Sequence, residues 1–217
     1  MMSKVTNNIR TLILGAALMQ ALSATAGAQQ ASPPPLPDGV FAAEKDIKLA
    51  TAGAYALDPQ HTAVMARVSH LGYSYSLFRF EKVEGTLSWD PANVAQAKLS
   101  ITIQVDSIAT PVPGFGAEIA GDNMLKAKAF PQATFVSSAF RQTDAMHGKV
   151  DGQFTLMGKT KPVTFDVTLV GAGKGFMGLP RMGVQARATI NPLDHGLPPF
   201  FVDPIEIVVD AEFGKTP

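Results

Sequence analysis

FTLMGKTKPVTFDVTLVG, residues 154–171, alternates apolar and polar side chains on both sides of a short polar turn. Phe154 and Leu156 flank Thr155, and after the turn an apolar side chain recurs at every second position over residues 163–169. A period of two is typical of β-strands with one apolar and one polar face. The stretch therefore predicts two antiparallel strands joined by a tight turn. What the apolar face covers decides the function.

The same alternation recurs through most of the chain beyond Tyr55. Strand patterns separated by turn residues, without a repeat of fixed period, are typical of an antiparallel β-protein. About eight such segments predict an all-β fold, either a closed antiparallel barrel or a two-sheet sandwich. An eight-stranded barrel has room for its own side chains or for one small ligand. The segments are 64–68, 87–89, 99–105, 133–140, 150–156, 163–169, 184–190 and 205–213, and the apolar face of 133–140 is ambiguous.

One segment has helical character. Asp122 or Asn123 is a candidate N-cap, Pro131 ends the segment, and the residues between them favour a short helix over 124–129. We therefore expect one short helix beside the strands.

The N-terminus predicts export. Lys4 and Arg10 precede an apolar run over residues 12–24, and small residues follow at Ala26 and Ala28. This order is typical of a secretory signal peptide. A retained anchor is the alternative, although the run is short for a membrane span. The predicted organisation is a signal peptide over 1–28, a proline-rich leader over 29–54 and a folded domain over 55–214.

The composition excludes several classes of function. Eighteen basic residues balance eighteen acidic ones, giving a net charge of zero. Nucleic-acid binding needs an excess of clustered positive charge, so we expect no nucleic-acid partner. The chain has no cysteine, which excludes disulfides, thiolate metal sites and cysteine nucleophiles.

The sequence shows no pattern for catalysis or metal binding. Ionisable side chains within the predicted strands have the parity of the polar face, whereas catalytic acids and bases need a sheltered site. The four histidines form no HxH or HExxH spacing, and no GxSxG motif occurs. We therefore predict no catalytic residue, no metal ligand and no cofactor. His70 and Asp203 lie at predicted strand ends, where a polar group either contacts a ligand or closes a hydrogen-bond network.

Seven short motifs follow one another along residues 55–213: Tyr55-x-Leu57-Asp58-x-x-His61-Thr62, Val68-x-His70-Leu71-Gly72, Phe80 with Val83-x-Gly85, Asp106-Ser107-Ile108-x-Thr110, Phe130-Pro131-x-Ala133-Thr134-Phe135-x-Ser137, the hairpin Val150 to Val163, and Ala188-Thr189-Ile190-Asn191 with Asp194-x-Gly196-Leu197. Together they resemble the motifs of the YceI-like family of polyisoprenoid-binding periplasmic proteins. Three positions depart from the family pattern: Asn123 stands where an Asp-Phe-Phe step usually begins, Pro192 replaces a basic residue, and His195 replaces an aromatic one.

The resemblance implies an antiparallel, eight-stranded, lipocalin-like barrel whose apolar tunnel holds an isoprenoid lipid. On this basis the apolar face of the opening hairpin would line a lipid-filled interior. Strand parity, rather than the family, supplies the predicted ligand-binding residues. They are Val68, His70, Phe80, Trp89, Ile101, Ile103, Phe135, Phe154, Leu156, Phe165, Val167, Leu169 and Ile190.

The resemblance and the strand pattern together leave three kinds of function open. The first is a periplasmic carrier of an isoprenoid lipid, of polyprenyl or quinone type. The second is an accessory protein that presents a quinone to a membrane b-type cytochrome, or an enzyme acting on an isoprenoid lipid. The third is a barrel with a filled core and a structural or interaction role. The absence of inward ionisable pairs weighs against the enzyme.

Overall fold

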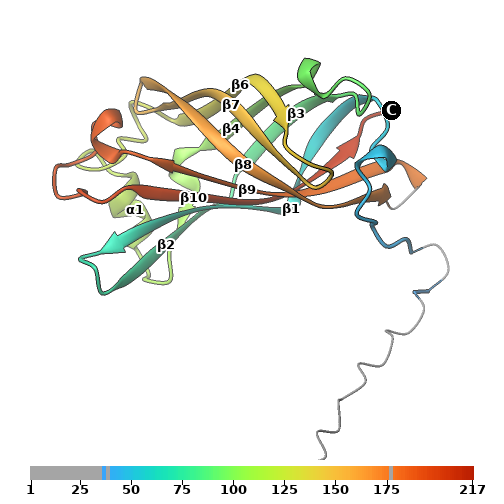
Figure 1. Cartoon of the computed structure of the whole chain (residues 1–217). Coiled ribbons are helices and arrows are strands. Elements are labelled where there is room, and N and C mark those ends of the chain that lie inside the picture. The colour runs from blue at the N-terminus through green and yellow to red at the C-terminus, as the bar shows by residue number, and fades with distance from the viewer. Residues whose placement is uncertain (1–35, 38–39, 176–177) are drawn as a thin grey trace, which may run out of the picture. The chain divides into compact units, whose positions relative to one another are not determined.

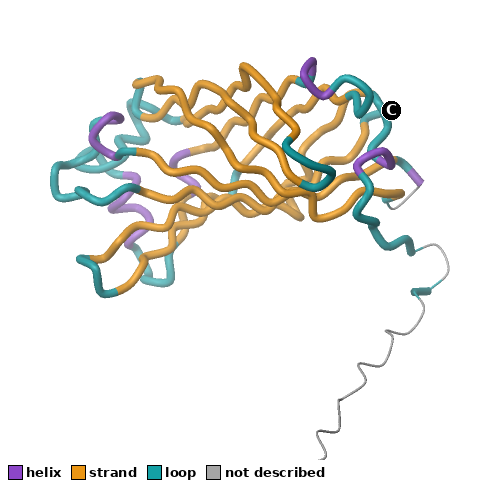
Figure 2. Tube along the Cα trace, in the orientation of Figure 1, coloured by secondary structure: helices purple, strands orange, loops and turns teal. Residues whose placement is uncertain are grey.

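The computed structural model describes residues 36–37, 40–175 and 178–217. The predicted signal peptide, residues 1–28, lies outside the described residues, as does the start of the leader. Leu36–Pro217 forms one compact unit. This unit is an all-β, antiparallel barrel with one short α-helix, as predicted (Figures 1 and 2). Among the described residues, no helix has the length and apolar character needed to cross a bilayer.

The described residues of this unit form ten strands and five short helical segments. The strands are β1 (Gly53–His70), β2 (Ser74–Phe80), β3 (Val83–Trp89), β4 (Lys98–Gln104), β5 (Ile108–Ala109), β6 (Gln132–Gln142), β7 (His147–Leu156), β8 (Lys159–Lys174), β9 (Pro180–Ile190) and β10 (Ile205–Lys215). The α-helix is α1 (Phe115–Ala120), and the 3-10 segments are η1 (Ile47–Leu49), η2 (Val94–Gln96), η3 (Val105–Ser107) and η5 (Pro192–His195).

Eight of the strands close into a ring. Their order is β1-β3-β4-β6-β7-β8-β9-β10, and β10 pairs again with β1. The first half of β1 pairs with β3, while its second half pairs with β2, and β2 pairs in turn with the short β5. β2 and β5 are therefore additions to the eight-stranded barrel. Closure removes the free strand edges that an open sheet would expose.

The opening stretch forms the β7–β8 hairpin, as its alternation predicts. The turn is centred on Met157 and Gly158, whose φ angles are 51° and 72°. A two-residue turn with positive φ at both central residues has a backbone twist that matches the right-handed twist of the two flanking strands. Leu156 and Lys159 form the strand pair next to the turn, and the pairing runs from there along both strands. In this register the side chains of Phe154 and Phe165 are buried inside the barrel.

A β-bulge explains the ambiguous face of residues 133–140. The register between β6 and β7 shifts between Ser137 and Ala139. Ala133 and Phe135 are buried before the bulge, and Phe140 faces the interior after it. Because the extra residue reverses the alternation, no single parity describes the whole strand.

The prediction of a helix over 124–129 is wrong. The α-helix of the structure, α1, lies earlier in the chain, at Phe115–Ala120. Residues after Gly121 form turns whose backbone returns to α1: Leu125 N–H donates to the Ile119 carbonyl at 3.0 Å and Ala127 N–H to that of Ala120 at 2.9 Å. This arrangement buries Leu125 and Ala127, which are two residues apart and would lie on different sides of a helix. Contacts with the barrel thus override the local helical preference.

The described end of the leader packs on the barrel. Glu44 and Ala172 of β8 exchange two backbone hydrogen bonds of 2.8 Å each. Ala50 is 0% exposed, and its carbonyl accepts a hydrogen bond of 3.0 Å from the indole of Trp89. The leader from Glu44 onward therefore covers the barrel end at which β1 begins and β3 ends.

Charged side chains pair across strands on the outer face. Arg141 contacts Asp151 with two hydrogen bonds of 2.6 and 2.8 Å. Glu206 accepts from both Arg67 and Arg187. The polar parity in the sequence thus corresponds to a solvated outer surface with paired charges.

Candidate functional site

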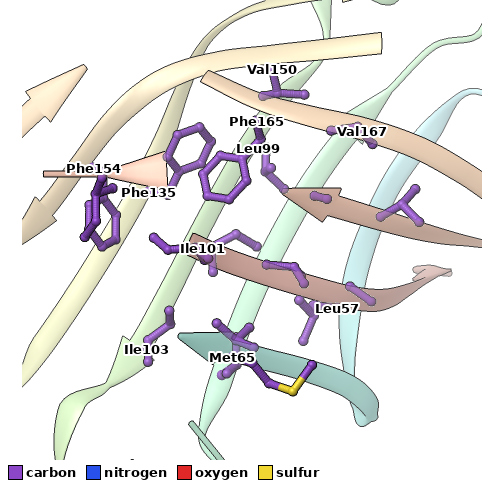
Figure 3. Close-up of a pocket in the computed structure, with 18 of the residues that line it drawn as sticks. Leu57, Met65, Leu99, Ile101, Ile103, Phe135, Val150, Phe154, Phe165 and Val167 are labelled. Carbon is purple, nitrogen blue, oxygen red and sulfur yellow. The ribbon is translucent and has the colours of Figure 1, made fainter. Parts of the chain in front are cut away.

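The barrel encloses a cavity of about 280 Å³. Apolar side chains from all eight barrel strands line it, and Figure 3 shows a group of them directed toward a common space. The rings of Phe135 and Phe165 meet edge to face there, with their centroids 5.0 Å apart. The volume lies near the lower end of the roughly 300–1,000 Å³ that ligand pockets occupy.

The interior is open rather than filled by its own side chains. Ile101 and Ile103 of β4 and Val167 of β8 line the cavity, yet each keeps part of its surface accessible. Side chains in a close-packed core lose nearly all of that surface. This difference favours a barrel that holds a ligand over one with a filled core.

Twelve of the thirteen predicted ligand-binding residues line the cavity, and His70 does not. β10 pairs with β1 only as far as Arg67, so His70 lies beyond the barrel wall, exposed and opposite Ser74. Ligand contact by the other twelve stays a prediction. They are Val68, Phe80, Trp89, Ile101, Ile103, Phe135, Phe154, Leu156, Phe165, Val167, Leu169 and Ile190.

Sequence parity missed two kinds of cavity residue. The first kind lies on strands that the sequence had already identified. Ala186 and Val209 are examples, since they have the same inward parity as the apolar residues two positions away. The second comes from loops, such as Met124 and Phe201, and has no periodic signal. Whether a loop residue lines the cavity depends on the course of the loop over the barrel end, and strand alternation carries no information about that course.

The end of the barrel near α1 is covered by buried apolar side chains. Ile119 of α1, Leu125 and Leu197 all line the cavity and are buried. At the opposite end, Ile47 of η1 and Trp89 contribute partly exposed apolar surface. The side chains that α1, η1 and Trp89 contribute at the two ends are therefore apolar.

The cavity reaches solvent at the β6–β7 hairpin, beside the leader end. Among the described residues that line the cavity, the exposed ones all belong to this hairpin: Arg141, Gln142, Asp144, Ala145 and His147. With Lys149, they also supply every ionisable group of the lining. We call residues 141–149 the cavity mouth.

The charges of the cavity mouth are paired within the protein. The Asp144 carboxylate accepts from the Met146 N–H at 2.8 Å and contacts the His147 ring at 2.9 Å, which lowers its pKa. Hydrogen bonding and attraction from Asp151 raise the pKa of Arg141. The mouth is thus polar and hydrated, while the lumen behind it is apolar.

His195 is a packing residue. It is 1% exposed, its ring lies edge to face with Phe154 at 5.3 Å, and its Nδ1 lies 3.2 Å from the Lys159 carbonyl. Burial lowers the pKa of His195 and outweighs the opposing effect of that hydrogen bond. A neutral imidazole in this position stabilises the closed barrel end and is not part of the cavity lining.

One cluster outside the cavity has the composition of a metal site. Ligand atoms of Asp58, His61 and Glu212 lie within 4.8 Å of one another. A guanidinium nitrogen of Arg181 lies between the two carboxylates, 2.7 Å from Asp58 and 2.5 Å from Glu212. Arg181 already supplies the positive charge that a cation would bring, so we interpret the cluster as an ion-pair network that joins β1, β9 and β10.

Replacing Asp58 by Asn should reduce stability at neutral pH but not in strong acid. Burial alone would raise the pKa of Asp58, but hydrogen bonds from His61 and Arg181 outweigh it and lower the pKa to about 2. A carboxylate whose pKa is lowered by folding stabilises the fold at pH values above its unfolded-state pKa, which is near 4. This contribution is lost as the pH falls toward the folded-state pKa of about 2. We expect Asp58→Asn to lower the free energy of unfolding by about 1 kcal/mol at pH 7, since solvent screens part of the pair.

Urea denaturation at pH 7, 4, 3 and 2 measures this difference. The wild type and Asp58→Asn should converge as the pH falls from 4 to 2. The matched control is Asp203→Asn in an exposed loop, which should change stability by less than about 0.5 kcal/mol at every pH. A constant difference between wild type and Asp58→Asn down to pH 2 would contradict the role of the charge.

The chain is similar to known proteins over nearly all of its barrel. The model of the YceI-like domain family matches residues 55–213. A UPF0312 protein of Pseudomonas putida strain W619 is 37% identical over 150 residues, which are 68% of this chain and 78% of that protein.

Solved structures share the fold. BcnA of Burkholderia cenocepacia superposes with a TM-score of 0.65 at 26% identity, over 72% of this chain and 98% of that one. A polyisoprenoid-binding domain of Saccharophagus degradans has a TM-score of 0.56 at 13% identity, over 75% of this chain and 98% of that one, and at this identity shows the fold alone. The match along residues 55–213 decides the relationship: the chain belongs to the YceI-like domain family.

Proposed function

We propose that this protein is a carrier that holds one isoprenoid lipid, of polyprenyl or quinone type, in the barrel cavity. The observation that carries the proposal is the lining: all eight strands direct apolar side chains into an open interior, and the ionisable groups gather at one mouth. An apolar chain gains free energy roughly in proportion to the surface it removes from water. The similarity in fold to the polyisoprenoid-binding domain of Saccharophagus degradans is consistent with this ligand class.

The lining supports binding rather than catalysis. A catalytic acid or base works where burial or a neighbouring charge tunes its pKa at the reacting group. Here the apolar chain would contact only apolar side chains, and the ionisable groups of the mouth are bonded to one another or to the outer face. A polar head group at the mouth would remain hydrated, so the protein would protect the chain and leave the head accessible. Presenting a quinone to a membrane b-type cytochrome would be one use of such a carrier.

We also propose that the carrier is periplasmic. The support is the order of basic residues, apolar run and small residues over positions 4–28, which is that of a cleaved signal peptide. Sequencing the N-terminus of the exported chain tests this, since cleavage after Ala28 would expose Gln29 and a retained Met1 would contradict it.

The carrier function predicts that lipid accompanies the purified protein. Protein exported by its bacterial host is purified without detergent and extracted with chloroform and methanol, and the extract is analysed by mass spectrometry. We expect an isoprenoid species in an amount approaching one molecule per protein. An unrelated exported protein, purified and extracted in the same way, gives the background. An extract at background level, or one containing only phospholipid or fatty acid, would contradict the proposal.

A further inference from the structure

The β1–β2 hairpin projects beyond the barrel wall. β10 pairs with β1 up to Arg67, whereas the pairing of β1 with β2 continues to His70 opposite Ser74. Residues 69–75 therefore have strand partners only within the hairpin, and Figure 1 shows β2 and the end of β1 extending away from the barrel. We call residues 69–75 the arm.

The arm ends in exposed apolar and aromatic side chains. Leu71 is 81% exposed and Tyr73 is 87% exposed, and both lie in the turn, while Tyr75 on the adjoining strand is 59% exposed. The loop that leads into β10 adds Phe200 and Val202, which are 62% and 71% exposed. Because Glu206 pairs with Arg67 at the base of the arm, this loop enters the sheet beside it. Where exposed apolar side chains gather at one place on a surface, they often mark a site of protein or membrane interaction.

The arm is rigid at its base. The ring of Phe78 in β2 is buried and lies 6.1 Å from the ring of Phe115 in α1. Arg67 carries its guanidinium 4.6 Å above the ring of Tyr75 and also pairs with Glu206. The base of the hairpin is therefore anchored to the barrel.

The charge of the hairpin favours an anionic partner. Between Ala63 and Phe80 the chain contains Arg67, His70 and Arg79 and no Asp or Glu. Arg79 is exposed. Arg67 is already paired with Glu206, and the neighbouring loop contributes Asp203 as an exposed carboxylate. Arg79 is therefore the exposed arginine that the hairpin offers to an anionic partner.

The shape of the tip favours a bilayer over a second protein. A specific protein interface buries about 800 Å² and roughly 20–30 residues on each partner. The arm offers seven residues on a convex turn. By contrast, tyrosine is enriched at the interface between lipid and water, where its ring is buried and its hydroxyl remains hydrated. Arg79 lies nearer the barrel on the same hairpin, and its exposed positive charge would attract an anionic bilayer surface.

We propose that the arm docks this protein on the surface of a bilayer that contains anionic phospholipid, with Leu71 and Tyr73 inserted at the level of the head groups. Docking depends on the arm and not on the contents of the cavity. Docking would bring the carrier to the bilayer, from which an apolar ligand is taken up or to which it is returned.

Vesicle flotation tests the proposal. Protein that begins at Gln29, which retains the whole unit Leu36–Pro217, is mixed with vesicles of phosphatidylethanolamine and phosphatidylglycerol at 3:1, or of phosphatidylcholine alone. We expect the wild type to float with the anionic vesicles. The double variant Leu71→Ser with Tyr73→Ser should lower the partition coefficient at least tenfold. Arg79→Gln should lower it about fivefold, and only for anionic vesicles.

A matched variant separates the arm from general surface hydrophobicity. Val136→Ser with Val170→Ser removes two apolar side chains of β6 and β8 that are 51% and 59% exposed, and should change partitioning by less than about twofold. Wild type that stays unbound, or a control that loses as much binding as the arm variant, would overturn the proposal. A third outcome would also overturn it: sedimentation velocity shows that the wild type is a dimer and the arm variant a monomer, while neither protein binds vesicles. The arm would then join two copies of this chain. Extracting lipid from the arm variant measures the carrier function independently, and its lipid content should equal that of the wild type.

Discussion

Ile101→Glu should abolish lipid binding while leaving a folded barrel. Ile101 lies at the centre of β4, is directed into the cavity and keeps part of its surface accessible there (Figure 3). An ionised carboxylate beside an apolar chain would lose its hydration without gaining a partner, which costs several kcal/mol. With the lipid absent, water that enters through the mouth can solvate the new carboxylate. We therefore expect at least a tenfold loss of co-purifying lipid and a circular dichroism spectrum like that of the wild type.

The neighbouring residue supplies the control. Ser100 belongs to the same strand but lies exposed on the outer face, opposite Thr86 and Val136. Ser100→Glu should retain lipid, because its carboxylate remains in water. Ile101→Met, which keeps the lining apolar at similar volume, should retain lipid as well. If Ser100→Glu lost lipid while a folded Ile101→Glu kept it, the assignment of the lumen as the ligand site would be wrong.

Alternation predicted which face of each strand forms the interior. Successive side chains of a strand point to opposite sides of the sheet, so Phe165 and Val167 share the face of Leu169 wherever the strand is regular. All three line the cavity. The same logic placed Arg67 and Asp151 in solvent, where the structure pairs each with an opposite charge.

Alternation failed where structure depends on relations between distant segments. His70 has the parity of Val68, but the pairing with β10 ends at Arg67, and the length of a neighbouring strand is not visible in the parity of β1. The segment around Leu125 has helical propensity, yet its backbone bonds to α1. The mouth at the β6–β7 hairpin was likewise unpredicted, because an opening depends on which parts of the barrel rim remain uncovered.

Gly152→Ala should destabilise the barrel by about 2–3 kcal/mol, which corresponds to a fall in melting temperature of about 5–10 °C for a domain of this size. Gly152 is buried in β7, and a Cβ atom there would lie 2.4 Å from the ring of Phe135 and 2.6 Å from the Val136 carbonyl oxygen. The ring covers the backbone at this position and would have to move. Gly183→Ala in β9 is the control, since its Cβ would meet nothing closer than 3.8 Å, and it should be neutral or slightly stabilising.

The displaced ring links stability to binding. Phe135 lines the cavity, with its ring centroid 5.0 Å from that of Phe165, so a ring pushed away from Gly152 moves into the space available to a ligand. Gly152→Ala should therefore also lower the lipid content. Phe135→Leu in the Gly152→Ala background removes the obstructing ring atoms and should restore part of both stability and lipid, with a favourable coupling of about 1 kcal/mol or more in a double-mutant cycle. Thermal unfolding and lipid extraction of the four proteins measure this coupling. Purely additive effects would mean that the ring of Phe135 is not what requires glycine at position 152.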